Sequence, residues 1–149
     1  MSTDDSYRLV LERVHRADLL SRRVADRSLA ADVGIGRAMF LILDLLASGE
    51  PVSQRTIADH LGLTTAAVSR HITTGRDRGW LRAESSPASR REHEVVLTSA
   101  GHALVERGRH RRDEAGRRAA GELGGAELRR MARSLQGLCG YLEEQLRER

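Results

Sequence analysis

Aromatic residues, cysteine and lysine are scarce in this sequence, and each scarcity narrows the possible functions. Aromatic residues make up 3% of the 149 residues, too few to build a stacking surface for the bases of RNA or single-stranded DNA. The single cysteine, Cys139, excludes an intrachain disulfide. Lysine is absent, so all 25 basic residues are arginine, the side chain that pairs bidentately with phosphates and guanine edges.

Long hydrophobic runs and enzymatic motifs are also missing. The longest dense apolar run, Ala38 to Ala47, is too short to cross a bilayer, and the acidic N-terminus lacks the pattern of a signal peptide. We find no nucleophile with a base partner, phosphate loop or dinucleotide loop, and the six histidines lack metal-ligand spacing. The sequence therefore predicts a cytoplasmic protein without membrane contact, catalysis, cofactor or metal, whose histidines are scattered over the surface.

The charge favours a polyanionic partner without proving one. The formal net charge is +4, but a salt-bridged helical surface would give the same value. The arginine-rich segment from Arg107 to Arg118 contains Asp113 and Glu114. A solvated helix face is therefore the favoured interpretation of this segment, over a second DNA-binding patch.

Helical periodicity predicts two helices before residue 50. The first runs from Ser6 to Ala31 and ends before the Gly34-Ile35-Gly36 break. The second runs from about Arg37 to Ser48 and is apolar on nearly all sides, so we expect it to be the buried centre of the fold.

The next segment predicts two short helices joined by a tight turn. Ser53 is a suitable N-cap for a helix ending at Leu61, and Gly62 supplies the left-handed turn after it. Thr64 caps a second helix that runs to about Arg78 and ends at Gly79. The short connection lets two helices cross steeply, which is helix-turn-helix geometry.

The two helices are expected to share a small apolar core, and the second helix to expose small polar residues on its other side. The expected core consists of Ile57, Ala58, Leu61, Leu63, Val68 and Ile72. The expected exposed residues are Thr65, Ala66, Ser69, Arg70 and Thr73. Small hydroxyl side chains with one arginine fit a DNA major groove, where a bulky apolar face would not.

A β-hairpin and two long helices are predicted to follow. Strands are expected at residues 80–84 and 93–97, with a polar turn at residues 85–91. Thr98 is expected to cap a helix reaching about Ala120, and residues 121–125 to break the chain before a helix from Ala126 to Arg147. The last helix has leucines and a methionine on one side, and such faces on the terminal helices predict burial across a two-fold dimer axis. These residues are Leu128, Met131, Leu135, Leu138, Leu142 and Leu146.

The combined pattern resembles the MarR family of bacterial transcriptional regulators. The helix-turn-helix residues are Ser53-x-x-x-Ile57-Ala58-x-x-Leu61-Gly62-Leu63-Thr64-x-x-x-Val68-Ser69-Arg70, followed by Arg78-Gly79-Trp80-Leu81. The wing residues are Ser86-Pro87-Ala88-Ser89-Arg90-Arg91, followed by Val95-x-Leu97-Thr98-x-x-Gly101. The flanking helices also have the order and lengths of that family, so the resemblance covers most of the chain.

The chain departs from the family pattern at two places. Ser86 and Ser89 stand where the family wing usually has acidic residues, one of which orients the arginine pair. Gly75 stands inside the second helix of the motif where the family prefers an apolar residue. A glycine there costs about 1 kcal/mol relative to alanine, and we expect it to loosen or bend the helix end.

The resemblance implies a mainly α fold with a small β-hairpin wing, in which a winged helix-turn-helix lobe is joined to a helical dimerisation lobe. The whole chain, residues 1–149, would be one MarR-like domain, with the DNA-binding lobe at residues 34–98. Residues 6–31 and 99–148 would supply the dimerisation helices. The implied function is that of a sequence-specific regulator, usually a repressor, which binds a pseudo-palindromic operator in duplex DNA as a homodimer. The alternative is a non-specific architectural DNA-binding protein.

The resemblance also assigns site residues. The DNA-binding residues would be Ser53, Gln54, Arg55, Thr64, Thr65, Ala66, Ser69, Arg70, His71, Thr73, Arg90 and Arg91. Many family members release DNA on binding a small phenolic or lipophilic effector in a crevice between the lobes. The residues placed there by family geometry are His15, Arg16, Phe40 and Leu43.

Several of these residues also have simpler interpretations. Arg70 could form a surface ion pair with Asp59 or Asp77, although DNA contact is favoured. His71 fits DNA contact and the outer flank of the helix equally well. Arg76 and Arg78 are similarly balanced between phosphate contact and a solvated helix end. Trp80 is interpreted as a packing residue and Cys139 as a buried interface thiol.

Overall fold

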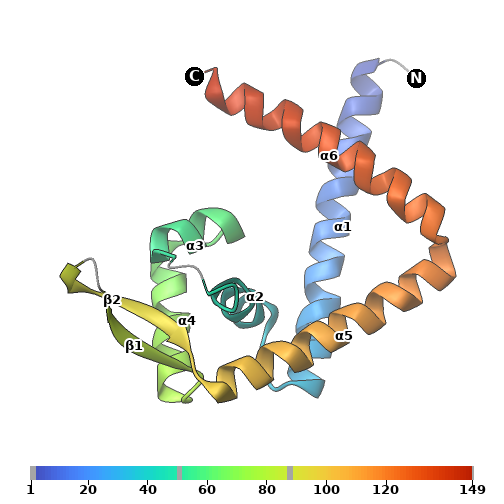
Figure 1. Cartoon of the computed structure of the whole chain (residues 1–149). Coiled ribbons are helices and arrows are strands. Elements are labelled where there is room, and N and C mark those ends of the chain that lie inside the picture. The colour runs from blue at the N-terminus through green and yellow to red at the C-terminus, as the bar shows by residue number, and fades with distance from the viewer. Residues whose placement is uncertain (1–2, 50–51, 87–88, 149) are drawn as a thin grey trace. The chain divides into compact units, whose positions relative to one another are not determined.

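The computed structural model describes residues 3–49, 52–86 and 89–148, which form six helices and a two-stranded antiparallel sheet (Figure 1). The chain divides into two compact units, residues 1–109 and 110–149. The prediction of a mainly helical protein with one small hairpin is confirmed. In the described residues, none of the helices is long and apolar enough to span a membrane.

The first unit begins with the helices α1 (Thr3–Asp32) and α2 (Arg37–Leu46). The N-cap of α2 is Gly36, whose lack of a side chain leaves the first N–H groups of the helix without a local cap. Asp26 of α1 supplies the missing acceptor, because its carboxylate accepts a hydrogen bond from the Arg37 N–H at 2.6 Å. No local sequence pattern predicts this cap, since the acceptor lies eleven residues before the helix start.

As predicted, α2 is the buried centre of the first unit. Ile42 and Leu43 have no exposed surface, and α2 contacts α1, the two helices of the helix-turn-helix and the second strand. The core around it is made almost entirely of aliphatic side chains. Its other buried members are Leu29, Val33, Ile35, Met39, Phe40, Leu46, Ile57, Ala58, Val68, Ile72, Leu81, Leu97, Leu104 and Val105.

The helix-turn-helix consists of α3 (Gln54–Leu61) and α4 (Thr65–Asp77), and its predicted signals are confirmed. Ser53 Oγ accepts a hydrogen bond from the Thr56 N–H, and Thr64 Oγ1 accepts one from the Ala67 N–H, both at 3.1 Å. Gly62 adopts the left-handed conformation with φ 63°, which a residue with a Cβ atom rarely adopts. The predicted core is also confirmed, because four of its members are buried and Leu61 and Leu63 pack against them.

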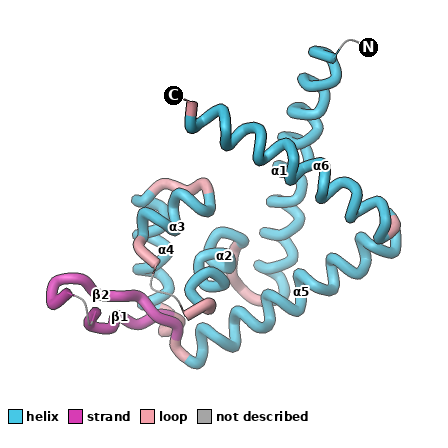
Figure 2. The backbone as a smooth tube through the Cα atoms, turned by 45° about the horizontal axis from the view of Figure 1, so that its top comes forward, coloured by secondary structure: helices cyan, strands magenta, loops and turns pink. Residues whose placement is uncertain are grey.

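The hairpin pairs β1 (Leu81–Ser86) with β2 (Ser89–Leu97), so that Leu81 lies opposite Leu97. Both strands run further than expected, because residues 85–91 were predicted to be a turn. Antiparallel pairing continues as far as Ser86 and Ser89, with an irregularity between Ser85 and Ser86. Polar composition predicted the turn, but backbone hydrogen bonds do not depend on side-chain polarity, so the ladder extends into the polar segment. The hairpin lies beside α4 (Figure 2).

Thr98 joins the hairpin to the following helix, α5 (Ser99–Leu123). Its N–H donates to the Trp80 carbonyl at 3.0 Å, and its Oγ1 accepts from the Gly101 N–H at 3.1 Å. The hydroxyl proton points toward the Gly79 carbonyl, 2.7 Å away. One threonine thus caps α5 and attaches it to the turn at the end of α4.

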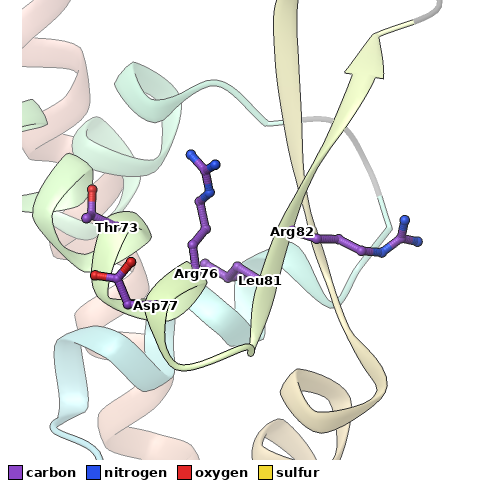
Figure 3. A pocket seen from close by; sticks show the side chains of 5 residues that line it. All are labelled: Thr73, Arg76, Asp77, Leu81 and Arg82. Carbon is purple, nitrogen blue, oxygen red and sulfur yellow. The ribbon is translucent and has the colours of Figure 1, made fainter.

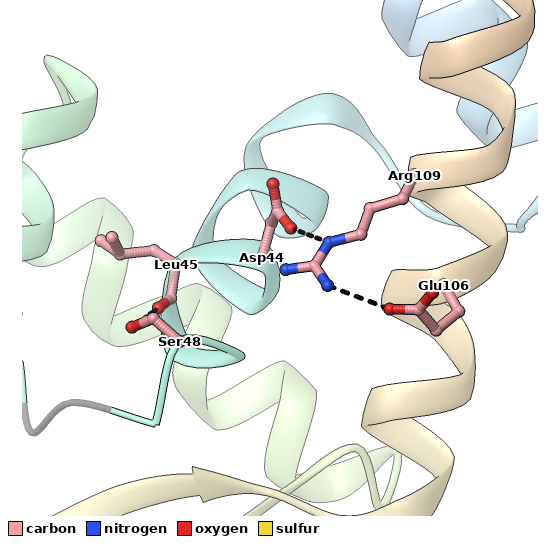
Figure 4. Close-up of polar contacts among 5 residues, drawn as sticks. All are labelled: Asp44, Leu45, Ser48, Glu106 and Arg109. Carbon is pink, nitrogen blue, oxygen red and sulfur yellow. Dashed lines mark hydrogen bonds and ion pairs between the residues drawn. The ribbon is translucent and has the colours of Figure 1, made fainter.

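Two contacts fix the start of α5 against α2. Gly108 lets the ring of Phe40 approach so closely that a Cβ atom there would lie 2.3 Å from Phe40 Cε2. The next residue, Arg109, donates to Asp44 Oδ1 at 2.7 Å and to Glu106 Oε1 at 3.0 Å (Figure 4). The hydrogen bond to Asp44 raises the pKa of Arg109 above its usual value. Asp44, the only acidic residue of α2, is therefore paired with a residue of α5.

The second unit contains the rest of α5 and α6 (Gly125–Arg147). The predicted break occurs at Gly124, which has φ 83°, but α5 continues to Leu123 instead of ending near Ala120. No residue of α6 is buried in the single chain. The apolar side predicted from the sequence is therefore open in part to solvent, with Leu146 79% exposed.

The contact between Gly108 and Phe40 predicts the effect of one added methyl group. We expect Gly108→Ala to lower the free energy of unfolding by about 1–3 kcal/mol, because the packed ring must shift. Gly116→Ala, in the same helix with nothing within 4 Å of its added Cβ, should instead raise it by up to about 1 kcal/mol. Urea unfolding at one protein concentration measures both variants. A Gly108 variant as stable as the Gly116 variant would contradict the packing described here.

The hydrogen bonds of Thr98 predict a difference between two conservative variants. Thr98→Val keeps the shape but loses the hydroxyl, so we expect it to cost about 1–2 kcal/mol of unfolding free energy. Thr98→Ser keeps the hydroxyl and should unfold close to wild type. Thermal unfolding followed by circular dichroism compares the two, and equal losses would show that the methyl group matters instead of the hydrogen bonds.

Candidate nucleic-acid interface

One side of α4 is packed against the core and the other is open to solvent. Val68, Ile72 and Gly75 are buried. The five residues predicted to face a major groove are all exposed, and helical spacing places them on the open side. They are Thr65, Ala66, Ser69, Arg70 and Thr73.

The hydroxyl groups of this region are partly used by the helices themselves. Ser53 and Thr64 act as N-caps, as described above, and Thr73 Oγ1 donates to the Ser69 carbonyl at 3.1 Å. Their oxygen atoms lie at an exposed surface, but the proton of Thr73 is engaged inside the helix. An arginine is therefore the strongest donor available to a ligand on this face.

Arg70 is exposed and does not form the ion pairs considered as an alternative. In the part of the chain that the structure describes, no ion pair joins it to Asp59 or Asp77. Asp59 lies 4.0 Å from Arg55 on α3, and both of those side chains are highly exposed. The guanidinium of Arg70 is thus presented outward from the middle of α4.

The other residues predicted to contact DNA differ in their exposure. Gln54 and Arg55 are exposed in the first turn of α3, as expected for a phosphate-contacting helix start. His71 is half-buried, which places it on the flank of α4. Arg90 and Arg91 lie in β2, but their side chains fall outside the described residues.

Gly75 has a packing role that the sequence did not reveal. We expected it to loosen or bend the end of the helix, and α4 continues past it to Asp77. A Cβ atom at position 75 would lie 2.6 Å from Leu81 Cδ1. The glycine allows β1 to pack directly on α4, so its lower helix propensity is offset by this close approach.

A polar groove lies where α4 and β1 meet, with a volume of about 550 Å³. It is lined by Thr73, Arg76, Asp77, Leu81 and Arg82 (Figure 3). Sequence reasoning left Arg76 undecided and did not consider Arg82. The helical spacing that relates Ser69, Thr73 and Arg76 was the available signal, because these residues form one row on α4.

The four residues predicted to line an effector crevice lie in different surroundings. Phe40 and Leu43 belong to the packed core of the first unit, and Leu43 has no exposed surface. His15 and Arg16 are exposed on α1. The structure therefore does not bring these four side chains together around an open crevice.

The remaining reactive groups are the potential metal ligands and one thiol. The described residues contain no cluster of three or more potential metal ligands. Cys139 is exposed on α6 in the single chain, so its predicted burial depends on a partner covering that helix.

Comparisons with known proteins agree with the geometry. Residues 33–92 match the model of the MarR family. This segment includes α2, the helix-turn-helix and most of the wing. No curated protein matches the chain.

Solved structures extend the likeness to the flanking helices. A MarR/EmrR family transcriptional regulator from Acinetobacter sp. ADP1 is 22% identical with a TM-score of 0.79, over 97% of this chain and 99% of that one. Sco3205 from Streptomyces coelicolor, a MarR family transcriptional regulator solved in complex with DNA, is 22% identical with a TM-score of 0.78, over 98% and 93%. The Mycobacterium tuberculosis MarR family protein RV2887, solved with salicylic acid, is 24% identical with a TM-score of 0.70, over 84% and 92%.

The resemblance seen in the sequence is thus confirmed by both kinds of comparison. Residues 33–92 match the MarR family model, and the chain has the fold of solved MarR-family transcriptional regulators.

Proposed function

We propose that this protein is a transcriptional regulator that binds a pseudo-palindromic operator in duplex DNA as a homodimer and represses transcription. The observation that carries the proposal is the open side of α4, which presents small residues and the exposed Arg70 beside a β-hairpin. A B-DNA major groove admits an α-helix. Small side chains let the helix backbone approach the bases, and the Arg70 guanidinium can pair bidentately with guanine O6 and N7.

The elements around α4 fit the flanking parts of such a complex. The first turn of α3 carries the exposed side chains of Gln54 and Arg55, which suit a backbone phosphate. The hairpin would place Arg90 and Arg91 in the adjacent minor groove, whose negative potential attracts arginine. Sco3205, which shares the fold, was solved in complex with DNA, and this supports DNA as the ligand.

The homodimer is proposed because α6 has an apolar side that the single chain leaves exposed. Met131, Leu135 and Leu142 are each about 40% exposed, and burying them against a second copy would remove apolar surface from water. A two-fold dimer also explains how one short helix gains specificity, since two copies read two half-sites separated by whole helical turns.

A small phenolic or lipophilic effector is proposed as the signal that releases DNA. The salicylic acid complex of RV2887 supports this class of ligand. The residues proposed to contact it remain His15, Arg16, Phe40 and Leu43. Since Leu43 is fully buried, the ligand would have to open the packing around α2 locally. Opening this packing would couple ligand binding to the position of the DNA-binding elements. The protein is proposed to act in the cytoplasm.

The proposal predicts preferential binding to one DNA sequence. We expect fluorescence anisotropy to show binding to the DNA upstream of the protein's own gene about a thousandfold tighter than to a scrambled duplex, with two chains per site. The logarithm of the affinity should fall linearly with the logarithm of the salt concentration. Equal, steeply salt-dependent binding to both duplexes would contradict self-regulation and favour the architectural alternative. No binding to either at low salt would contradict DNA binding itself.

Single arginine variants test the reading face. We expect Arg70→Ala and Arg90→Ala each to weaken operator binding by about 1–3 kcal/mol if the side chain contacts a base edge. Arg118→Ala removes an exposed arginine of α5 and should leave specific binding nearly unchanged, which makes it a control for net charge. Unchanged affinity in both the Arg70 and the Arg90 variants would show that the groove assignment is wrong.

A further inference from the structure

The groove between α4 and β1 is not used by the contacts proposed so far. Its floor is the buried Leu81, and its rim carries Thr73 and Arg76 on one element and Arg82 on the other. Figure 3 shows the Arg76 guanidinium extending along the groove, away from the Asp77 carboxylate. Arg76 is exposed, and it forms no ion pair with any residue that the structure describes.

The position of this groove follows from how a winged helix docks. If α4 lies in a major groove and the hairpin reaches the adjacent minor groove, a sugar–phosphate backbone must run between them. That backbone separates the two DNA grooves, so it must pass over the place where α4 and β1 meet. In that arrangement the groove would lie close to a phosphate that neither the base-reading residues of α4 nor the wing tip contacts.

We propose that the α4–β1 groove is a subsite for one backbone phosphate of the bound duplex, with Arg76 as its principal ligand. The inference rests on the proposed DNA-binding function and adds a residue to it. Arg76 lies one turn beyond Thr73 on α4, so its guanidinium reaches past the base-reading residues toward the wing. The Thr73 proton is already donated to Ser69, and the phosphate is therefore bound mainly by charge-assisted hydrogen bonds from arginine.

Asp77 restricts the phosphate to one side of the groove. Its carboxylate lies on the rim of the same groove and repels a phosphate. The anion is therefore held on the Arg76 side. A phosphate contact positions the protein without reading a base, so this subsite contributes equally to all sequences and fixes the angle between α4 and the duplex.

The test is a salt series with Arg76→Gln, because the salt dependence of binding counts phosphate contacts. Anisotropy is measured with the upstream fragment and with a scrambled duplex. We expect the slope of log affinity against log salt to decrease by about 0.9 for each bound protomer. We also expect the affinity for the two duplexes to fall by the same factor, which is the signature of a phosphate contact.

Two further variants control for charge. Arg78→Gln removes an arginine two residues away, whose guanidinium lies 5.9 Å from the centre of the Trp80 ring, and it should leave the slope nearly unchanged. Asp77→Asn removes the opposing carboxylate and should strengthen binding to both duplexes at low salt. Circular dichroism confirms that each variant is folded.

The outcomes separate this inference from the function on which it rests. A wild-type slope in Arg76→Gln, or equal slope losses in the Arg76 and Arg78 variants, would overturn the subsite while leaving DNA binding intact. A loss of affinity for the upstream fragment alone would also overturn it, because it would make Arg76 a base-reading residue. Failure of the wild-type protein to bind either duplex would overturn both proposals.

Discussion

The burial of α2 is the constraint on which the rest of the first unit depends. This helix contacts α1, α3, α4 and β2, and its central side chains are completely removed from water. Burial of this kind supplies most of the stability of a small unit. Because α2 touches both helices of the helix-turn-helix and the hairpin, a change in its packing would move the elements proposed to contact DNA.

Two glycines and one ion pair let the neighbouring elements pack closely in this unit. Gly75 lets β1 pack on α4, and Gly108 lets α5 pack on the ring of Phe40. Asp44, in the last turn of α2, is paired with Arg109 of α5. The pairing keeps a partly buried carboxylate from being unsatisfied.

The sequence predicted the local features well because their causes are local. The caps at Ser53 and Thr64, the left-handed Gly62 and the buried face of α4 each follow from residues within one or two turns. The features that it missed depend on contacts between distant segments. Asp26 caps a helix that begins eleven residues later, and the role of Gly75 is defined by Leu81 of a neighbouring strand. Polar residues in the hairpin predicted a turn, whereas strand pairing continued through them.

In the candidate DNA-binding site, too, the sequence predicted the local features and missed those that depend on contacts between distant segments. Helical spacing was sufficient to identify the open side of α4, including Arg70. The groove with Arg76 appears only when α4 and β1 are brought together, and the effector residues were inferred from family geometry alone. In the structure, Phe40 and Leu43 are core residues, so a crevice at that position requires a rearrangement that no sequence pattern describes.

The central claim is that the open side of α4 reads bases in a major groove. Methylation interference tests it most directly, using a duplex that the protein selects from a random-sequence pool, because a methyl group on guanine N7 blocks the major-groove edge that Arg70 would contact. The account predicts interference at guanines in two half-sites related by two-fold symmetry, with centres about one helical turn or a multiple of it apart. Tight binding that no guanine N7 methylation disturbs would contradict it.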